Sequence, residues 1–178
     1  MIDCPMPTRQ DARSYLVLYA TRLLGRPYMW GGESEAEGGD DCSGFVHEVL
    51  VALARHWPDL YDGERRSAAG LFGYFVNRGV ATKGRVPDLV PGMAVFWHKQ
   101  DAIVHVRLHL ATLPPMTAVG DHDLLPVGPV GIESSGGGPD VTSPRAALKA
   151  TAGVRFCATD TYRGGTAWVA LDFLSLIP

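Results

Sequence analysis

The stretch "GGDDCSGFVHEVL", residues 38–50, places a cysteine between two aspartates and the start of an amphipathic helix. Asp40 and Asp41 disfavour a thiolate, because a like charge opposes ionisation of a neighbouring thiol. The N-terminus of the following helix favours a thiolate, since unpaired N–H groups there attract negative charge. Two interpretations of Cys42 follow: an inert buried thiol, or a nucleophile placed on a helix end.

The residues on either side of this stretch predict a helical first half of the chain. Apolar residues at helical spacing, after a capping threonine, predict a helix over 8–24. The helix that begins near Cys42 should end before Pro58, and a third helix should cover 67–77. Residues 26–41, between the first two helices, carry glycines and an acidic middle, which predicts a long solvated loop.

The second half of the chain predicts short strands instead. After Pro91, runs rich in β-branched and aromatic residues recur between turn residues. These runs are 93–98, 103–112, 129–135, 154–160 and 166–174. The sequence "TYRGG", residues 161–165, separates the last two runs and predicts a hairpin. Because helices come first and strands later, we expect an α+β fold, in a single domain over residues 1–178.

Composition excludes several classes of protein. The chain has 178 residues, 46% hydrophobic and 20% charged, which is typical of a globular protein with one core. Its net charge is -3 and no basic run occurs, so we expect no nucleic-acid partner. No apolar run reaches the roughly 20 residues that cross a bilayer, and no leader-like segment opens the chain. We therefore expect synthesis in the cytoplasm without a signal peptide, no membrane partner, and a monomer.

The three cysteines do not suggest a disulfide framework. Cys4, Cys42 and Cys157 have wide, irregular spacing that also matches no zinc ribbon. Cys4 and Cys157 have no basic partner nearby in sequence, so we interpret them as structural.

A histidine and a carboxylate farther along the chain strengthen the nucleophile interpretation of Cys42. His105, in "IVHVRLHL", could supply the base that a cysteine nucleophile needs. Glu133, in "GIESSGGG" on the next predicted strand, could hold that imidazole in the correct tautomer. A cysteine on a helix end facing a histidine on a sheet is the papain-like arrangement.

The wider sequence around Cys42 resembles a known signature. Residues 23–46, "LLGRPYMWGGESEAEGGDDCSGFV", resemble the NlpC family of bacterial cell-wall cysteine peptidases, which carry L-G-x-P-Y-x-W-G-G, a short loop and G-x-D-C-S-G. Residues 91–111, "PGMAVFWHKQDAIVHVRLHLA", resemble two strands of the same family. The resemblance covers about residues 12–135 and implies a papain-like fold, with N-terminal helices packed on a mainly antiparallel sheet.

The resemblance also implies roles for individual residues. Cys42 matches the nucleophile and His105 the general base, while Glu133 falls where the family usually has His, Asn or Gln as third catalytic residue. The substrate-binding residues that it implies are Tyr28, Asp41 and Ser43. Tyr28 matches a tyrosine beside the cysteine, and the other two match positions that grip the free amine of a short peptide.

Three positions depart from the family pattern. Met93 replaces the aspartate of the P-G-D turn, and His109 replaces a strand tyrosine. Arg107 replaces a small residue after His105, and a bulky cation there is expected to reshape the substrate groove.

The resemblance implies cysteine-dependent amide hydrolysis of peptidoglycan stem peptides, typically between γ-D-glutamate and a diamino acid. In that reaction His105 takes the thiol proton, Cys42 attacks, and backbone N–H groups at the helix start hold the oxyanion. No cofactor is required. Two alternatives stay open. One is a phage lysin, tail component or secreted effector that is delivered to the cell wall. The other is a catalytically idle structural or binding module.

Other conspicuous residues have structural explanations that involve no metal or catalysis. In "HVRLH", residues 105–109, two histidines four apart could share a zinc ion on a helix. On a strand they lie roughly 13 Å apart, too far for one ion, and the alternating pattern favours a strand. "DHD", residues 121–123, offers further ligands, but we favour no metal site. The four large aromatics near the motifs, Trp30, Phe45, Phe96 and Trp97, are expected in the core.

Overall fold

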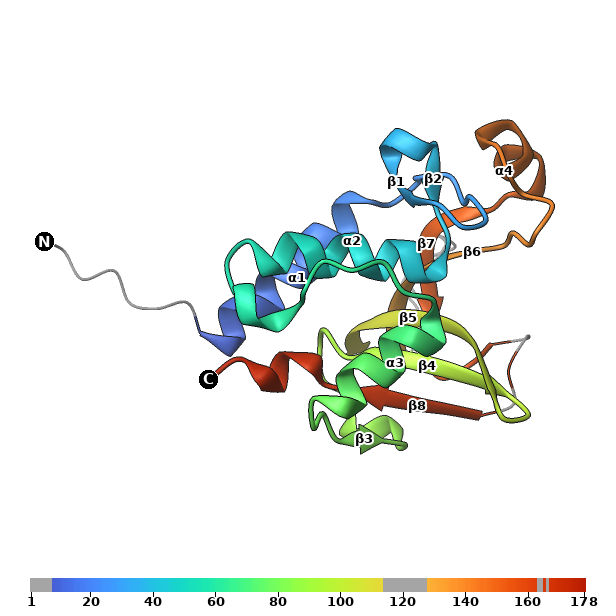
Figure 1. Ribbon diagram of the computed structural model, residues 1–178. Coiled ribbons are helices and arrows are strands. Elements are labelled where there is room, and N and C mark those ends of the chain that lie inside the picture. The colour runs from blue at the N-terminus through green and yellow to red at the C-terminus, as the bar shows by residue number, and fades with distance from the viewer. Residues whose placement is uncertain (1–7, 114–127, 163–164, 166) are drawn as a thin grey trace, which may run out of the picture.

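A computed structural model describes residues 8–113, 128–162, 165 and 167–178 of the chain (Figure 1). The α-helices of these residues are α1 (Arg9–Arg22), α2 (Cys42–Ala54), α3 (Ala68–Asn77) and α4 (Pro144–Ala150). The strands are β1 (Glu33–Ser34), β2 (Gly39–Asp40), β3 (Thr82–Lys83), β4 (Ala94–Lys99), β5 (Ala102–Leu113), β6 (Gly128–Ser135), β7 (Gly153–Ala158) and β8 (Ala167–Leu171). Short 3-10 turns lie at Glu35–Glu37, Pro58–Leu60, Val86–Asp88 and Phe173–Leu176.

Side-chain caps begin the helices where the sequence predicts. Thr8 caps α1 and exchanges hydrogen bonds with Asp11, which forms a capping box. Asp41 caps α2 and Ser67 caps α3 by accepting a backbone N–H of the first turn. All three predicted helices are therefore confirmed. α4 was not predicted, although its start carries the usual signal of a capping serine followed by Pro144.

Six strands form one sheet in the order β3-β8-β4-β5-β6-β7, and each neighbouring pair is antiparallel. The five predicted strands are all present. The predicted hairpin at "TYRGG" is wrong, because β7 pairs with β6 while β8 pairs with β3 and β4. β7 and β8 instead flank β4, β5 and β6 in the sheet, and Tyr162, in the segment after β7, contacts Trp97 and His105.

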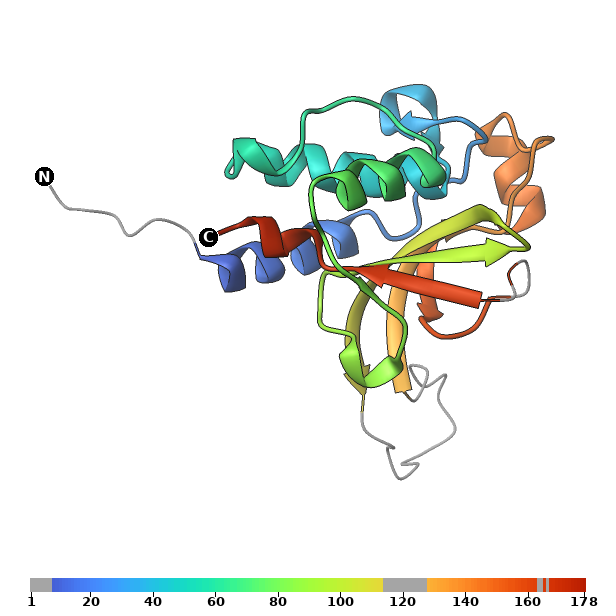
Figure 2. The ribbon, with the colours of Figure 1, turned by 60° about the horizontal axis from the view of Figure 1, so that its bottom comes forward.

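The helices α1, α2 and α3 cover one face of the sheet (Figure 2). Their apolar side chains share one core cluster with alternate residues of β5, which are Val106, Leu108 and Leu110. The intervening residues His105, Arg107 and His109 therefore leave the sheet on its other side. The antiparallel pairing of β5 with both β4 and β6 confirms a strand through "HVRLH".

Several local predictions are wrong. Residues 33–40 form a small hairpin around a 3-10 turn rather than a plain solvated loop, and Asp40 is fully buried. Trp30 is 53% exposed and lies outside the core, whereas Phe45, Phe96 and Trp97 are buried as expected. Across the described part of the chain, no helix combines the length and the apolar character that crossing a membrane requires.

Candidate active site

Cys42 is the first residue of α2, so the strand-turn-helix geometry places its side chain where the helix meets the sheet. The helix approaches the preceding loop closely, because a Cβ on Gly44 would lie only 2.0 Å from the carbonyl oxygen of Gly32. Only glycine fits there. The half-buried Cys42 thiol lines a cavity of about 270 Å³ and also packs against the main core cluster.

The same cavity collects the residues that the sequence singled out. Its lining includes Tyr28, Asp41, Cys42, Ser43 and His105, which come from the loop after α1, from the start of α2 and from β5. The remaining lining comes from β5, from the end of β6 and the glycine-rich turn after it, from the α3 start, and from Trp30 and Tyr162. Segments far apart in sequence thus converge on one hollow beside the thiol.

His105 is held by Glu133 from the neighbouring strand. The imidazole Nε2 lies 2.8 Å from Glu133 Oε2, and both side chains are buried. Burial favours the neutral form of Glu133, but the hydrogen bond with His105 and the charges of Arg107 and Arg155 lower its pKa to about 2. Glu133 is therefore an ionised acceptor, so Nε2 carries a hydrogen and Nδ1 of the neutral ring is free to accept a proton.

Arg107 binds the Glu133 carboxylate of this pair and lines a hollow that adjoins the cavity of Cys42. Its side chain is 1% exposed, and its Nη2 lies 2.7 Å from Glu133 Oε2, the oxygen that also binds His105. Its Nη1 donates to the carbonyl oxygen of Thr161 at 2.8 Å. The reshaping of the groove expected from Arg107 remains a prediction, because Arg107 lines an adjoining hollow that shares Gly137 and Tyr162 with the cavity of Cys42.

Tyr162 covers the imidazole of His105. The two rings stack with centroids 4.4 Å apart and planes inclined by 9°. Arg107 lies 5.3 Å from the centroid of the same tyrosine ring, within cation–π range. Tyr162 was not predicted, because its position depends on where β7 and β8 lie in the sheet and no local pattern signals that order.

Tyr28 forms another wall of the cavity, and the turn after β6 packs against it. A Cβ on Gly137 would lie 2.2 Å from the Tyr28 ring, so glycine is required there. Ser134 Oγ donates to the carbonyl oxygen of Asp40 at 2.6 Å, which joins β6 to the segment just before Cys42. Burial raises the pKa of Tyr28, and Cys42 and Asp41 add to the shift. The Tyr28 hydroxyl is therefore a neutral hydrogen-bonding group.

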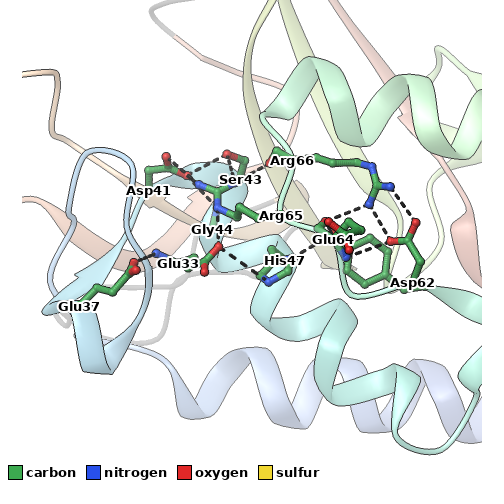
Figure 3. Close-up of polar contacts among 11 residues, drawn as sticks. Glu33, Glu37, Asp41, Ser43, Gly44, His47, Asp62, Glu64, Arg65 and Arg66 are labelled. Carbon is green, nitrogen blue, oxygen red and sulfur yellow. Dashed lines mark hydrogen bonds and ion pairs between the residues drawn. The ribbon is translucent and has the colours of Figure 1, made fainter.

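Both carboxylate oxygens of Asp41 accept hydrogen bonds from within the chain, and Figure 3 draws those from Ser43, Gly44 and Arg65. Its Oδ1 accepts from Ser43 Oγ at 2.8 Å and from Gly44 N at 2.7 Å. Both of its oxygens lie 3.1 Å from Nη2 of Arg65, a residue of the loop between α2 and α3. Asp41 caps the helix of Cys42, and the amine-binding role expected for it remains a prediction.

Burial keeps the Cys42 thiol and the His105 imidazole neutral when no substrate occupies the cavity. It raises the pKa of Cys42 to about 11, with Asp41 adding to the shift while backbone groups of Val106 and Ser43 oppose it. Burial also lowers the pKa of His105, and Glu133 opposes that shift. A neutral thiol beside a neutral base is the resting state that this arrangement favours, with Glu133 positioned to stabilise an imidazolium once the proton moves.

The other histidine of "HVRLH" belongs to a different environment. His109 is fully buried, its Nδ1 lies 3.1 Å from Thr159 Oγ1, and burial lowers its pKa to about 4. Within the ranges that the structure describes, no three His, Cys, Asp or Glu side chains come close enough to hold a metal ion. Cys4 and the "DHD" segment lie outside these ranges, while Cys157 is a half-buried free thiol on β7.

Neither models of known protein families nor characterised proteins match the sequence. Among solved structures, the chain is similar to the crystal structure of the NlpC/p60 domain of the peptidoglycan hydrolase SagA, with a TM-score of 0.55 and 17% sequence identity. The similarity covers 90% of this chain and 97% of that domain. The expected α+β, papain-like NlpC fold is thereby confirmed.

Proposed function

We propose that this protein is a cysteine peptidase that hydrolyses an amide bond of peptidoglycan stem peptides. One observation carries the proposal: Cys42, at the start of a helix, shares a cavity with His105, and Nε2 of His105 is hydrogen-bonded to buried Glu133. The fold that it shares with a peptidoglycan hydrolase domain supports the choice of substrate.

The catalytic sequence follows from the positions of these groups. His105 Nδ1 accepts the thiol proton as Cys42 Sγ attacks the scissile carbonyl carbon, and Glu133 stabilises the resulting imidazolium. The backbone N–H of Cys42, at the first position of α2, has no intrahelical acceptor and can hold the oxyanion. His105 then returns its proton to the leaving amine, and water hydrolyses the acyl-enzyme.

The surrounding side chains suit a peptide. Tyr28 lines the cavity of the thiol with its hydroxyl-bearing ring, and Tyr162 stacks on His105 and shields it from solvent. Shielding strengthens the hydrogen bond between the imidazole and Glu133, because electrostatic interactions are stronger where water is excluded. We propose the bond between γ-D-glutamate and a diamino acid as the one cleaved.

Digestion of purified peptidoglycan, followed by mass analysis of the soluble fragments, tests this function. The unaltered protein should release fragments that end at one defined amide bond, and Cys42→Ala should release none. A folded Cys42→Ala protein that still digests the wall would refute the proposed mechanism. An unaltered protein that binds the wall but cleaves no bond would identify a binding module instead.

A further inference from the structure

The carboxylate of Asp41 has no acceptor site left for a ligand. Its Oδ1 lies within hydrogen-bond distance of Ser43 Oγ, Gly44 N and Arg65 Nη2, at 2.8, 2.7 and 3.1 Å. Its Oδ2 lies 3.1 Å from both Gly31 N and Arg65 Nη2. A carboxylate offers about four lone-pair sites in total, and these five contacts use all of them.

Arg65 is held in this position by more than Asp41. Its Nη1 donates to Ser43 Oγ at 3.0 Å and its Nε lies 3.0 Å from Glu33 Oε2 (Figure 3). Nη1 also donates to the carbonyl oxygen of Arg66. All three nitrogens of the guanidinium are therefore engaged, and its planar shape matches this fixed set of acceptors.

The position of this ion pair beside Cys42 makes it relevant to substrate choice. Asp41 and Ser43 line the same cavity as the thiol, so a peptide bound across Cys42 must pass them. A free ammonium group at this point needs a carboxylate partner, because an unpaired charge is costly to remove from water. Here the partner is already neutralised by Arg65. An acylated nitrogen carries no charge and needs no such partner.

We infer that Arg65 is a specificity-determining residue that excludes a free ammonium group from the Asp41–Ser43 end of the cavity. The preferred substrates are then stem peptides whose N-terminal nitrogen is acylated, such as those still attached through an amide to the glycan. This inference rests on the proposed peptidase function and specifies which form of the substrate the site accepts.

A pair of synthetic stem peptides, identical except that one is N-acetylated, tests the inference. The unaltered protein should cleave the acetylated peptide with the higher kcat/KM. Arg65→Ala should move the ratio of the two kcat/KM values toward the free amine by about tenfold or more, because Asp41 becomes available for a charge-assisted hydrogen bond. Arg65→Lys should give an intermediate ratio.

Arg66→Ala is the matched control. Arg66 is the next residue in the chain, and its guanidinium pairs with Asp62, with Nη1 2.7 Å from Oδ1, rather than with Asp41. Its removal deletes the same charge from the same loop and should leave the ratio unchanged. If Arg65→Ala does not fold, Arg65→Gln keeps a polar, hydrogen-bonding side chain without the charge and should shift the ratio in the same direction.

A strong preference of the unaltered protein for the free-amine peptide would overturn the inference. So would the same ratio of kcat/KM values for the two peptides in the unaltered protein, in Arg65→Ala and in Arg65→Gln. Either result leaves Cys42-dependent hydrolysis intact. If neither peptide is cleaved, the proposed function fails. Calorimetry then measures binding of both peptides to the Cys42→Ser protein and to the double variant Cys42→Ser, Arg65→Ala. The inference fails unless Arg65→Ala selectively strengthens binding of the free-amine peptide.

Discussion

Arg107 Nη2 and His105 Nε2 share a single acceptor, Oε2 of Glu133, at 2.7 and 2.8 Å. The sequence departs from the resembled family at two of these positions, with a cation after the histidine and a carboxylate where a neutral residue is usual. The structure shows that the two departures compensate each other. A lone buried carboxylate would be costly to desolvate, and the buried guanidinium of Arg107 neutralises it.

Removal of one partner of this ion pair should destabilise the fold. Arg107→Met leaves Glu133 buried with neutral His105 and with the more distant cation of Arg155, whose Nη2 lies 3.6 Å from Oε1. We expect the free energy of unfolding, measured in urea, to fall by about 3–5 kcal/mol. The double variant Arg107→Met, Glu133→Gln removes both charges and should recover most of that loss. If the double variant is no more stable than Arg107→Met, the two residues do not compensate each other.

The same charges should control the pH dependence of catalysis in opposite directions. Glu133 raises the pKa of His105 and Arg107 lowers it, against the larger lowering by burial. Glu133→Gln should therefore move the acidic limb of the kcat/KM profile to lower pH, because the free imidazole stays neutral further into acid. Arg107→Met should move it to higher pH. The profiles are measured where both variants are folded, and shifts of the same sign would refute this assignment.

Alkylation should separate Cys42 from Cys157. Burial raises the pKa of Cys157 to about 12, whereas Cys42 lines a cavity together with His105, the proposed base. In a Cys4→Ser protein near neutral pH, iodoacetamide should label Cys42 first, as located by peptide mass analysis. His105→Ala should slow this labelling. Equal labelling rates of both thiols would contradict a cysteine–histidine pair. So would a labelling rate of Cys42 that His105→Ala leaves unchanged.

The two histidines of β5 should differ sharply when each is replaced by alanine. His105→Ala should abolish nearly all hydrolysis while the protein remains folded, because no base remains to accept the thiol proton. His109→Ala should retain most activity and lose about 2 kcal/mol of stability, since its ring is buried against Thr159. Activity of the two variants on stem peptides, with urea unfolding of each, gives the comparison. The reverse order would mean that the base is misassigned.

Local sequence patterns predicted the helices and the main strands well. Caps such as Thr8 and Ser67 mark helix starts because they act on the nearest backbone N–H groups, and alternation along β5 reflects the two faces of a sheet. Cys42, His105 and Glu133 could be proposed because two of them lie in recognisable motifs and the third on the following strand.

Sequence patterns did not predict the long-range contacts of Asp41 and Arg107 at the site. Arg65 meets Asp41 across 24 residues, and Arg107 meets the Thr161 carbonyl across 54. Such contacts depend on the path of the whole chain and leave no periodic signature. The hairpin prediction for "TYRGG" failed for the same reason, because turn residues look alike whether the following strand pairs locally or crosses the sheet.

The place of β8 in the sheet has a consequence for the protein during its own synthesis. This strand lies between β3 and β4, although it follows every other strand of the described residues in the sequence. Tyr162 precedes it by a few residues, and Arg9 at the start of α1 bonds the carbonyl oxygen of Ile177 at 3.1 Å. A nascent chain therefore carries Cys42 and His105 well before it can hold them in place. We therefore expect the site to form only after β8 has been synthesised, because β8 closes the sheet and Tyr162 covers the histidine.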